Sequence, residues 1–127
     1  MTDTVRVSPG VMFVGHYKVP AGRVEEWRAA NRTMTAFVEA NLPDVFSFDA
    51  YLSADGTAGT SIHIHRDAES FERYLAAMAT MIGQGMQIVE VTGIDLYGAP
   101  RPEIVERLRQ MGSFPVHVHT HENGFGR

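Results

Sequence analysis

The sequence predicts an α+β domain of the ferredoxin-like type, with the element order strand, helix, strand, strand, helix, strand. Apolar residues recur at every second position in some segments and at every third or fourth position in others, so strands and helices alternate along the 127 residues. The pair Asp55-Gly56 lies between two strand-like segments and marks a hairpin turn. In such a βαββαβ chain, right-handed crossovers place the first and third strands side by side in the middle of an antiparallel sheet.

Turn formers and capping residues set the expected limits of these elements. Pro43 disfavours helical backbone at the residue before it, so the first helix should end near Asn41. Asp67 is suited to cap the second helix. The apolar phase changes along the fourth strand, which a bulge near Gly93 would explain. The expected strands cover residues 11–19, 45–52, 60–66 and 86–97, and the expected helices begin at Val24 and Ala68.

Residues 99–121 are expected to form an accessory arm beside a βαββαβ core of residues 11–97, within a single domain of residues 1–127. Pro102 suits the first turn of a short helix, and Gly112 suits its end. A histidine-rich strand follows. It should add to a sheet edge, with the edge of the partner subunit as the favoured one, because its backbone groups need partners.

Composition excludes several classes of function. The net charge is −4 and Lys and Arg are not clustered, which argues against nucleic-acid binding. No apolar run approaches 18 residues, so no membrane span is expected. There is no cysteine, and therefore neither a disulfide nor thiolate chemistry. The first ten residues lack the apolar stretch of a signal peptide, and a cytoplasmic location is expected.

Aromatic side chains on both faces of the strand over 45–52 predict a homodimer. Alternation puts Phe46 and Phe48 on one face and Tyr51 on the other. Two helices can cover only one face of the sheet. A second copy of the chain is the expected cover for the other face, across an interface on the order of 2,000 Å².

Two stretches resemble a known family. "VGHYKVPAGRVEEW" and "SIHIHRDAESFERYL" are similar to the first strand-to-helix entry and the third-strand exit of the dimeric α/β-barrel superfamily, especially its antibiotic biosynthesis monooxygenase-like (ABM) domains. The resemblance covers residues 11–97. It implies a small-molecule pocket between sheet and helices, and its members include quinone-forming oxygenases that use no cofactor.

The resemblance also places individual residues. His65 stands where the family usually has a pocket-lining Trp, Tyr74 stands where many members have His, and Gly15 stands where the haem-degrading branch has Asn. The Asn–Trp–His set of that branch is thus missing, which disfavours haem degradation. No cofactor is expected.

The resemblance points His63 and His65 into that pocket, because residues two apart on a strand share a face. His65 would be the base that deprotonates a phenolic ligand, supported by His63, and Tyr17 and Tyr74 would orient the oxyanion. Hydrophobicity alone predicts the opposite, with the neighbouring isoleucines under the helices. The alternative is that both are satisfied core or interface histidines. The expected ligand-binding residues are Tyr17, Gly15, Trp27, Phe71 and Met78.

The last strand carries His117, His119 and His121 at every second position. Two histidines so spaced can chelate a transition metal. The alternative, which we favour, is a solvent-facing edge strand in which polar side chains prevent aggregation.

The sequence therefore predicts a small-molecule-binding dimeric α/β-barrel protein. The first hypothesis is a cofactor-independent monooxygenase or isomerase that acts on a phenolic or polycyclic ligand. One alternative is a non-catalytic ligand-binding or stress-associated dimer, and a second is a metal protein that uses the C-terminal histidines.

Overall fold

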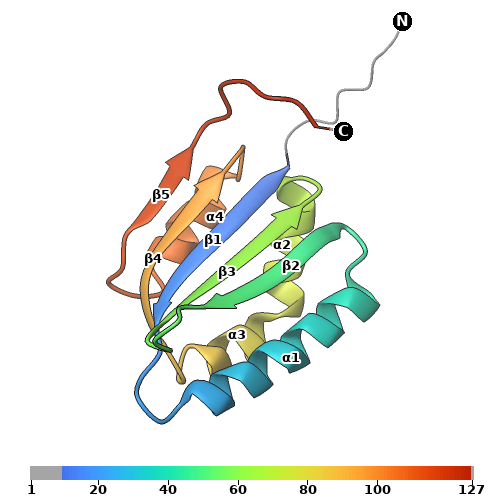
Figure 1. Cartoon of the computed structure of the whole chain (residues 1–127). Helices are drawn as coiled ribbons and strands as arrows, with labels where there is room; N and C mark the ends of the chain where they lie inside the picture. The colour runs from blue at the N-terminus through green and yellow to red at the C-terminus, as the bar shows by residue number, and fades with distance from the viewer. Residues whose placement is uncertain (1–9, 127) are drawn as a thin grey trace, which may run out of the picture.

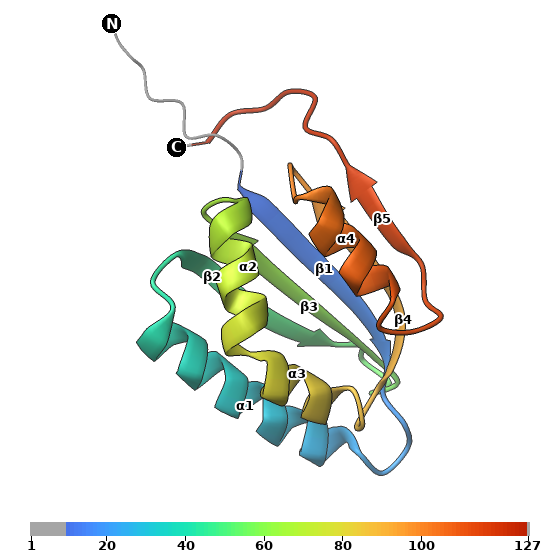
Figure 2. The same ribbon diagram turned by 180° about the vertical axis from the view of Figure 1, so that it is seen from behind.

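The structure is a computed structural model that describes residues 10–126, and it forms one five-stranded sheet with helices packed on one face (Figures 1 and 2). The strand order is β2-β3-β1-β4-β5, in which the first four strands pair antiparallel and β5 runs parallel to β4. The elements are β1 (Val11–Lys18), α1 (Val24–Asn41), β2 (Val45–Leu52), β3 (Ala58–His65), α2 (Ala68–Ala77), α3 (Ala79–Gly85), β4 (Glu90–Tyr97), α4 (Pro102–Arg109) and β5 (Val116–His119).

The predicted α+β order is confirmed, and β1 and β3 lie side by side as expected. The helix that begins at Ala68 differs from the prediction, because it breaks at Met78 into α2 and α3. Residues 86–89 were expected to be strand, and they form a turn that leads into β4. None of the helices within residues 10–126 has the length and apolar character that crossing a bilayer requires.

A bulge lies next to Gly93, as the phase change predicts. Gly93 pairs with His16, but Val91 pairs with the next residue of β1, so Thr92 is an extra residue in β4. The Thr92 hydroxyl donates a hydrogen bond of 3.1 Å to the carbonyl oxygen of His16. Because of this bulge, Val91 faces the helices on the same side of the sheet as Ile94.

The C-terminal segment packs onto the same helical layer. Ile104, Val105 and Leu108 of α4 are buried in the main hydrophobic core, and so is Val116 of β5. The β5 strand adds to a sheet edge as expected, but this is the free edge of β4 in its own chain and not an edge of the partner. That residues 11–97 form a self-sufficient core stays a prediction.

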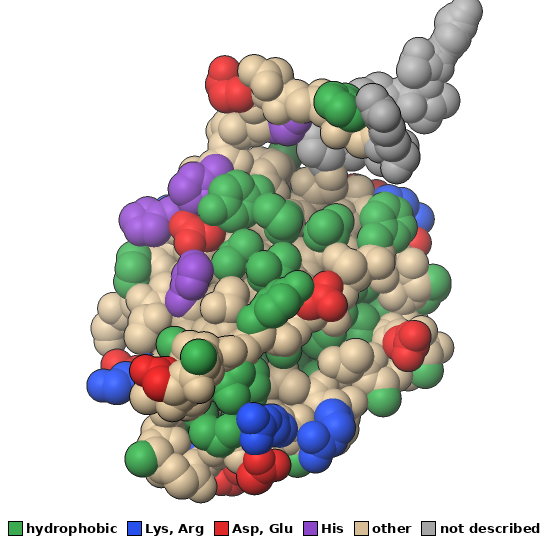
Figure 3. Space-filling model, in the orientation of Figure 1, with side chains coloured by type: hydrophobic (Ala, Val, Ile, Leu, Met, Phe, Trp, Pro, Cys, Tyr) green, Lys and Arg blue, Asp and Glu red, His purple; other side chains and the backbone are tan. Residues whose placement is uncertain are grey.

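No helix among residues 10–126 covers the opposite face of the sheet, called the open sheet face, and apolar side chains gather on it (Figure 3). Tyr51 is 56% exposed and Ile64 is 38% exposed. Phe46 does not share a face with Phe48 as the alternation predicted, because the pairing of β2 with β3 is irregular between Val45 and Ser47. Phe46 sits at this irregularity and is 58% exposed, whereas Phe48 packs under the helices.

Candidate functional site

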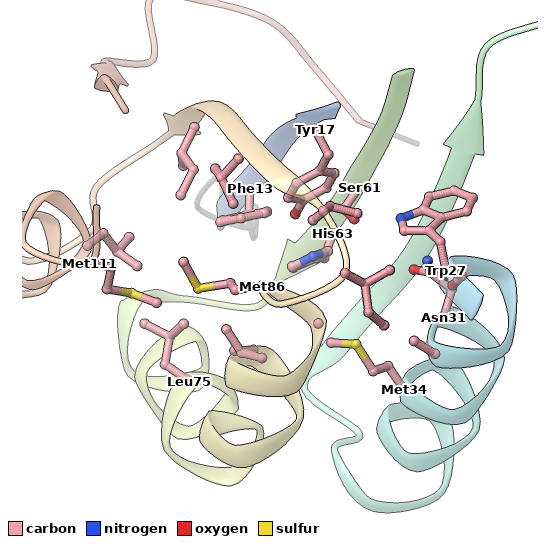
Figure 4. A pocket seen from close by; sticks show the side chains of 18 of the residues that line it. Phe13, Tyr17, Trp27, Asn31, Met34, Ser61, His63, Leu75, Met86 and Met111 are labelled. Atoms are coloured by element: carbon pink, nitrogen blue, oxygen red, sulfur yellow. Dashed lines mark hydrogen bonds between the residues drawn. The ribbon is translucent and has the colours of Figure 1, made fainter. Parts of the chain in front are cut away.

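A cavity of about 110 Å³, part of a larger hollow that opens to solvent, lies between the sheet and the helices. Its walls come from β1 to β4, from α1 to α4, and from the segment that joins α4 to β5. Among the described residues, none of the side chains that line it is an Asp, Glu, Lys or Arg. In Figure 4, Tyr17, Ser61 and His63 project from neighbouring strands into the cavity, and together with Tyr74 they form its polar end. Apart from Asn31 on α1, apolar side chains, several of them methionines, form the remaining walls.

The imidazole of His63 is held between two phenyl rings. Phe13 on β1 and Phe48 on β2 are the direct cross-strand partners of His63 on β3. The ring centroid of His63 lies 4.5 Å from that of Phe13 and 4.5 Å from that of Phe48, with interplanar angles of 14° and 28°. Aromatic stacking of this kind fixes the plane of the middle ring. Only the edges of the imidazole, which carry its nitrogens, are left for polar contacts.

His65 lies behind His63 and does not line the cavity. Its Nε2 is 3.3 Å from Nδ1 of His63, and its ring packs against Phe71 and Tyr74 at centroid distances of 5.0 and 4.9 Å. Its Nδ1 is buried, with no hydrogen-bond partner among the described residues. Since Nδ1 of His63 faces His65, Nε2 is the nitrogen of His63 left for a ligand.

Both imidazoles are neutral at physiological pH. Burial lowers the pKa of His65 from 6.5 to about 4. Burial also lowers the pKa of His63 well below its usual value, and the neighbouring His65 lowers it further. The charged form of each ring would lose its hydration without gaining an anionic partner.

Gly15 makes room for Tyr17 on the same face of β1. A Cβ atom on Gly15 would lie 2.8 Å from Cζ of Tyr17, so the phenol ring occupies the space that a side chain would fill. Gly15 is paired with Ser61, and Ser61 hydrogen-bonds the Tyr17 hydroxyl. Burial raises the pKa of Tyr17, and the hydrogen bond with Ser61 partly offsets this rise.

Tyr74 brings a second phenol from α2. It is 3% exposed and lines the cavity, and its ring centroid is 5.0 Å from that of His63. Burial raises its pKa, and the nearby Tyr17 raises it further. Both tyrosines therefore keep their protons at neutral pH and are available as hydrogen-bond donors.

No family model matches this sequence, and no curated protein matches it either. Solved structures do match. MupZ from Pseudomonas fluorescens has a TM-score of 0.73 and 19% identity over 92% of this chain and 93% of MupZ. SnoaB from Streptomyces nogalater, a cofactor-independent oxygenase, has a TM-score of 0.62 and 20% identity over 74% of this chain and 96% of SnoaB. A protein of Bacteroides thetaiotaomicron with a provisional designation as an antibiotic biosynthesis monooxygenase has a TM-score of 0.57 and 15% identity over 68% of this chain and 85% of its own.

This chain has the fold of the ABM-like proteins. The resemblance seen in the two sequence stretches is thereby confirmed at the level of the fold, and identities of this size carry no activity with them. The match to SnoaB is about as long as the βαββαβ core. The match to MupZ covers 92% of the chain, so it must extend beyond Tyr97 into the segment that holds α4 and β5.

Within this ABM-like fold, the predicted site residues separate into two groups. Tyr17, Trp27, His63 and Tyr74 line the cavity. The other four do not line it. Gly15 lies beneath Tyr17, and the remaining three are fully buried behind the wall of the cavity, namely His65, Phe71 and Met78.

The structure adds lining residues that were not predicted. Asn31, one turn after Trp27 on α1, reaches the cavity, and its amide donates to the Trp27 carbonyl at 2.9 Å. Met86 and Met111 lie at the ends of α3 and α4. The spacing of Asn31 from Trp27 could have signalled its position. The two methionines belong to turns, where apolar period gives no signal.

The histidines of the last strand are not gathered into a cluster. His119 Nε2 donates to one carboxylate oxygen of Asp95 at 2.9 Å, and His16 Nε2 donates to the other at 2.9 Å. These hydrogen bonds, first that from His119, hold the pKa of Asp95 below its usual value. The strand ends at His119, so His121 lies outside it. Within residues 10–126, no group of three or more His, Cys, Asp or Glu side chains is placed to hold a metal ion.

Proposed function

We propose that this protein binds a neutral, largely apolar molecule, with aromatic or fused rings and one hydrogen-bonding oxygen, in the cavity between its sheet and its helices. The observation that carries the proposal is the uncharged and mostly apolar lining of the cavity, in which the polar side chains are those of the polar end and of Asn31. A carboxylate or phosphate placed there would lose its hydration without meeting an opposite charge, which costs several kcal/mol. A neutral ring system loses little and gains contact with apolar walls.

The walls suit a rigid ring system. Phe13, Phe48 and Trp27 offer aromatic surface on the sheet side and from α1. Met34, Met86 and Met111 lie on the helical side, and methionine adapts its shape to a ligand because its side chain is unbranched and flexible. The polar end would then fix the orientation of the ligand through Tyr17, His63 and Tyr74.

Catalysis is the second candidate function, as a cofactor-independent monooxygenase or isomerase on a phenolic or polycyclic ligand. The similarity of the fold to SnoaB and the group of one imidazole and two phenols at the polar end favour it. In this proposal, His63 replaces His65 as the imidazole that contacts the ligand. Oxygen uptake or isomerisation with a phenolic ligand, measured without added cofactor, tests it. Any turnover should fall roughly 10²–10³-fold in His63→Phe, the loss typical of removing one hydrogen-bond donor to a developing oxyanion.

We also propose that the protein acts as a homodimer that is closed through the open sheet face. Support comes from Phe46, Tyr51, Ile64 and Tyr97, which leave apolar surface in solvent on the described chain. Contiguous apolar patches of this kind are typical of interfaces.

A cavity-filling variant tests the ligand site. Ala30 on α1 lines the cavity, whereas the preceding Ala29 is exposed. We expect Ala30→Phe to weaken binding of Nile red, a neutral fused-ring fluorophore, at least tenfold, while the matched control Ala29→Phe leaves it unchanged. Fluorescence titration measures both, and circular dichroism checks that the variants are folded. Equal affinity in both variants would place the probe elsewhere. Tighter binding of 2-fluorenecarboxylate than of fluorene would contradict the uncharged character of the site.

A further inference from the structure

The pair formed by His63 and His65 constrains where the protons of both rings lie. The two imidazoles meet edge to edge, with Nδ1 of His63 at 3.3 Å from Nε2 of His65. One of these nitrogens has to carry the hydrogen, because two lone pairs or two N–H groups would repel each other. Each neutral imidazole carries one proton. The choice of donor in this contact therefore also determines whether the outer nitrogen of each ring, Nε2 of His63 and Nδ1 of His65, is protonated.

The outer nitrogen of His65 decides between the two arrangements. If His63 donated, then His65 would carry its own proton on Nδ1, as a buried N–H group without an acceptor among the described residues. If His65 donates through Nε2, its Nδ1 carries only a lone pair. Buried N–H groups without a partner are rarer in proteins than unpaired acceptors. The second arrangement is therefore the stable one, and it places the proton of His63 on Nε2.

We propose that His65 is a positioning residue that locks His63 as its Nε2–H tautomer, so that His63 meets the ligand as a hydrogen-bond donor and not as a base. The stack between Phe13 and Phe48 holds the plane of the ring, and the contact of Nδ1 with His65 selects which edge of the ring faces the cavity. Burial keeps both rings neutral, so the donor is an uncharged imidazole.

The Nε2–H tautomer of His63 also predicts the class of ligand, and this second step rests on the proposed function. A donor at Nε2 of His63 and the protonated phenols of Tyr17 and Tyr74 make the polar end rich in donors. Its complement is an acceptor, namely the carbonyl oxygen of a ketone or quinone on an apolar ring system. The same donors would stabilise negative charge that develops on this oxygen.

The tautomer is testable without any ligand. Two-bond ¹H–¹⁵N correlation spectra of the labelled protein at pH 7 report which nitrogen of each imidazole is protonated, and His63→Phe assigns the signals. We expect Nε2–H for both His63 and His65. An Nδ1–H tautomer or an imidazolium at His63 would overturn the proposal, whatever the protein binds.

The variants at His65 test the locking. His65→Gln keeps an N–H donor for Nδ1 of His63, so His63 should stay in the Nε2–H form. His65→Phe removes that donor, and both tautomers of His63 should then appear in the spectrum. An unchanged His63 spectrum in His65→Phe would show that another contact sets the tautomer. Should that variant fail to fold, the spectra of the wild type and of His65→Gln still decide the assignment.

Three tricyclic probes of nearly equal shape test the ligand class. Fluorenone offers one acceptor, carbazole offers one N–H donor, and fluorene offers neither. A neutral hydrogen bond contributes about 0.5–1.5 kcal/mol, so fluorenone should bind roughly twofold to tenfold more tightly than fluorene. His63→Phe should remove most of this preference, and carbazole should gain less than fluorenone does. A preference for carbazole would overturn the donor assignment. Binding of none of the three would refute the proposed function and the ligand class together, while the spectra would still decide the tautomer.

Discussion

Acidification should destabilise this fold through its two buried imidazoles before any carboxylate is affected. In the unfolded chain, histidine takes up a proton near pH 6.5. In the folded protein, the pKa of His65 is about 4 and that of His63 is well below its usual value. Between these limits, the unfolded state binds more protons than the native state, so the free energy of unfolding falls as the pH falls. Above about pH 6.5, both imidazoles are mostly neutral in the unfolded state as well, so the free energy of unfolding no longer depends on their protonation.

The magnitude follows from the shift of His65. Its pKa lies about 2.5 units below 6.5, and each unit corresponds to about 1.4 kcal/mol. His65 alone should therefore remove about 3 kcal/mol of stability between pH 6.5 and pH 4. His63 acts in the same direction over the same range. Since a domain of this size has a total stability of about 5–15 kcal/mol, the loss should be a large part of it.

Urea denaturation followed by circular dichroism at pH 7.0, 6.0, 5.0 and 4.5 measures this loss. Protein concentration must be held constant, because a dimer would link stability to concentration. The aspartates with lowered pKa values, Asp55, Asp67 and Asp95, accept protons only below this range, and the pKa of Glu26 is likewise held below 4.5 by its hydrogen bond with Arg23. The slope of stability against pH should become smaller in His63→Phe. Stability that does not change between pH 6.5 and 4.5 would refute the argument and would mean that the imidazoles are hydrated.

Four further predictions follow from the packing. Ile64→Glu on the open sheet face should give a monomer in light scattering, whereas Val118→Glu should stay dimeric, because Val118 is similarly exposed but lies on the side of the sheet that carries the helices. The dimer proposal would be contradicted if both variants were monomers or if both were dimers. A chain that ends at Gly98 should keep its sheet in circular dichroism but lose Nile red binding, because Leu108, Met111 and Phe114 form one wall of the cavity; retained affinity would show that this wall is dispensable. Replacing His117, His119 and His121 together with Gln should change stability by about 1 kcal/mol or less, and stoichiometric metal that survives dialysis only in the wild type would contradict this. Gly15→Ala should weaken ligand binding because the new Cβ would lie 2.8 Å from both Cε1 of Phe13 and Cζ of Tyr17 and displace the phenol, and unchanged affinity would show that Tyr17 does not contact the ligand.

Much of the fold could be predicted because its signals are local. The apolar period and Pro43 gave the limits of α1, and the phase change in β4 gave the bulge beside Gly93. Residues 86–89 were predicted as strand because three of them are apolar. The structure gives another reason for that apolar character, since Met86, Ile88 and Val89 line the cavity. A turn that forms the wall of a cavity has the composition of a strand, and local pattern cannot separate the two.

The site was harder to predict, because its geometry depends on contacts between distant segments. Alternation put His63 and His65 on one face, and the structure places that face under the helices. Alternation cannot show which of the two meets the cavity. That depends on where Phe71 and Tyr74 of α2 cross the strand, since they close over His65 and leave His63 open. Likewise, Gly15 was predicted as a ligand contact, but it acts by making space for Tyr17.

Stability alone does not explain why imidazoles occupy positions 63 and 65. A phenyl ring at position 63 would complete a stack with Phe13 and Phe48 without burying a polar group. An apolar side chain at position 65 would avoid the nitrogen that has no partner, since a buried polar atom left unsatisfied costs about 1–3 kcal/mol. Each histidine instead partly satisfies the other, through a hydrogen bond that a pair of phenyl rings would not need. Sequences depart from the most stable local choice mainly where function requires it. Here the unpartnered nitrogen belongs to His65, which is hydrogen-bonded to His63, the single imidazole that lines the cavity. This arrangement is the one expected if His65 serves to orient His63 toward a ligand.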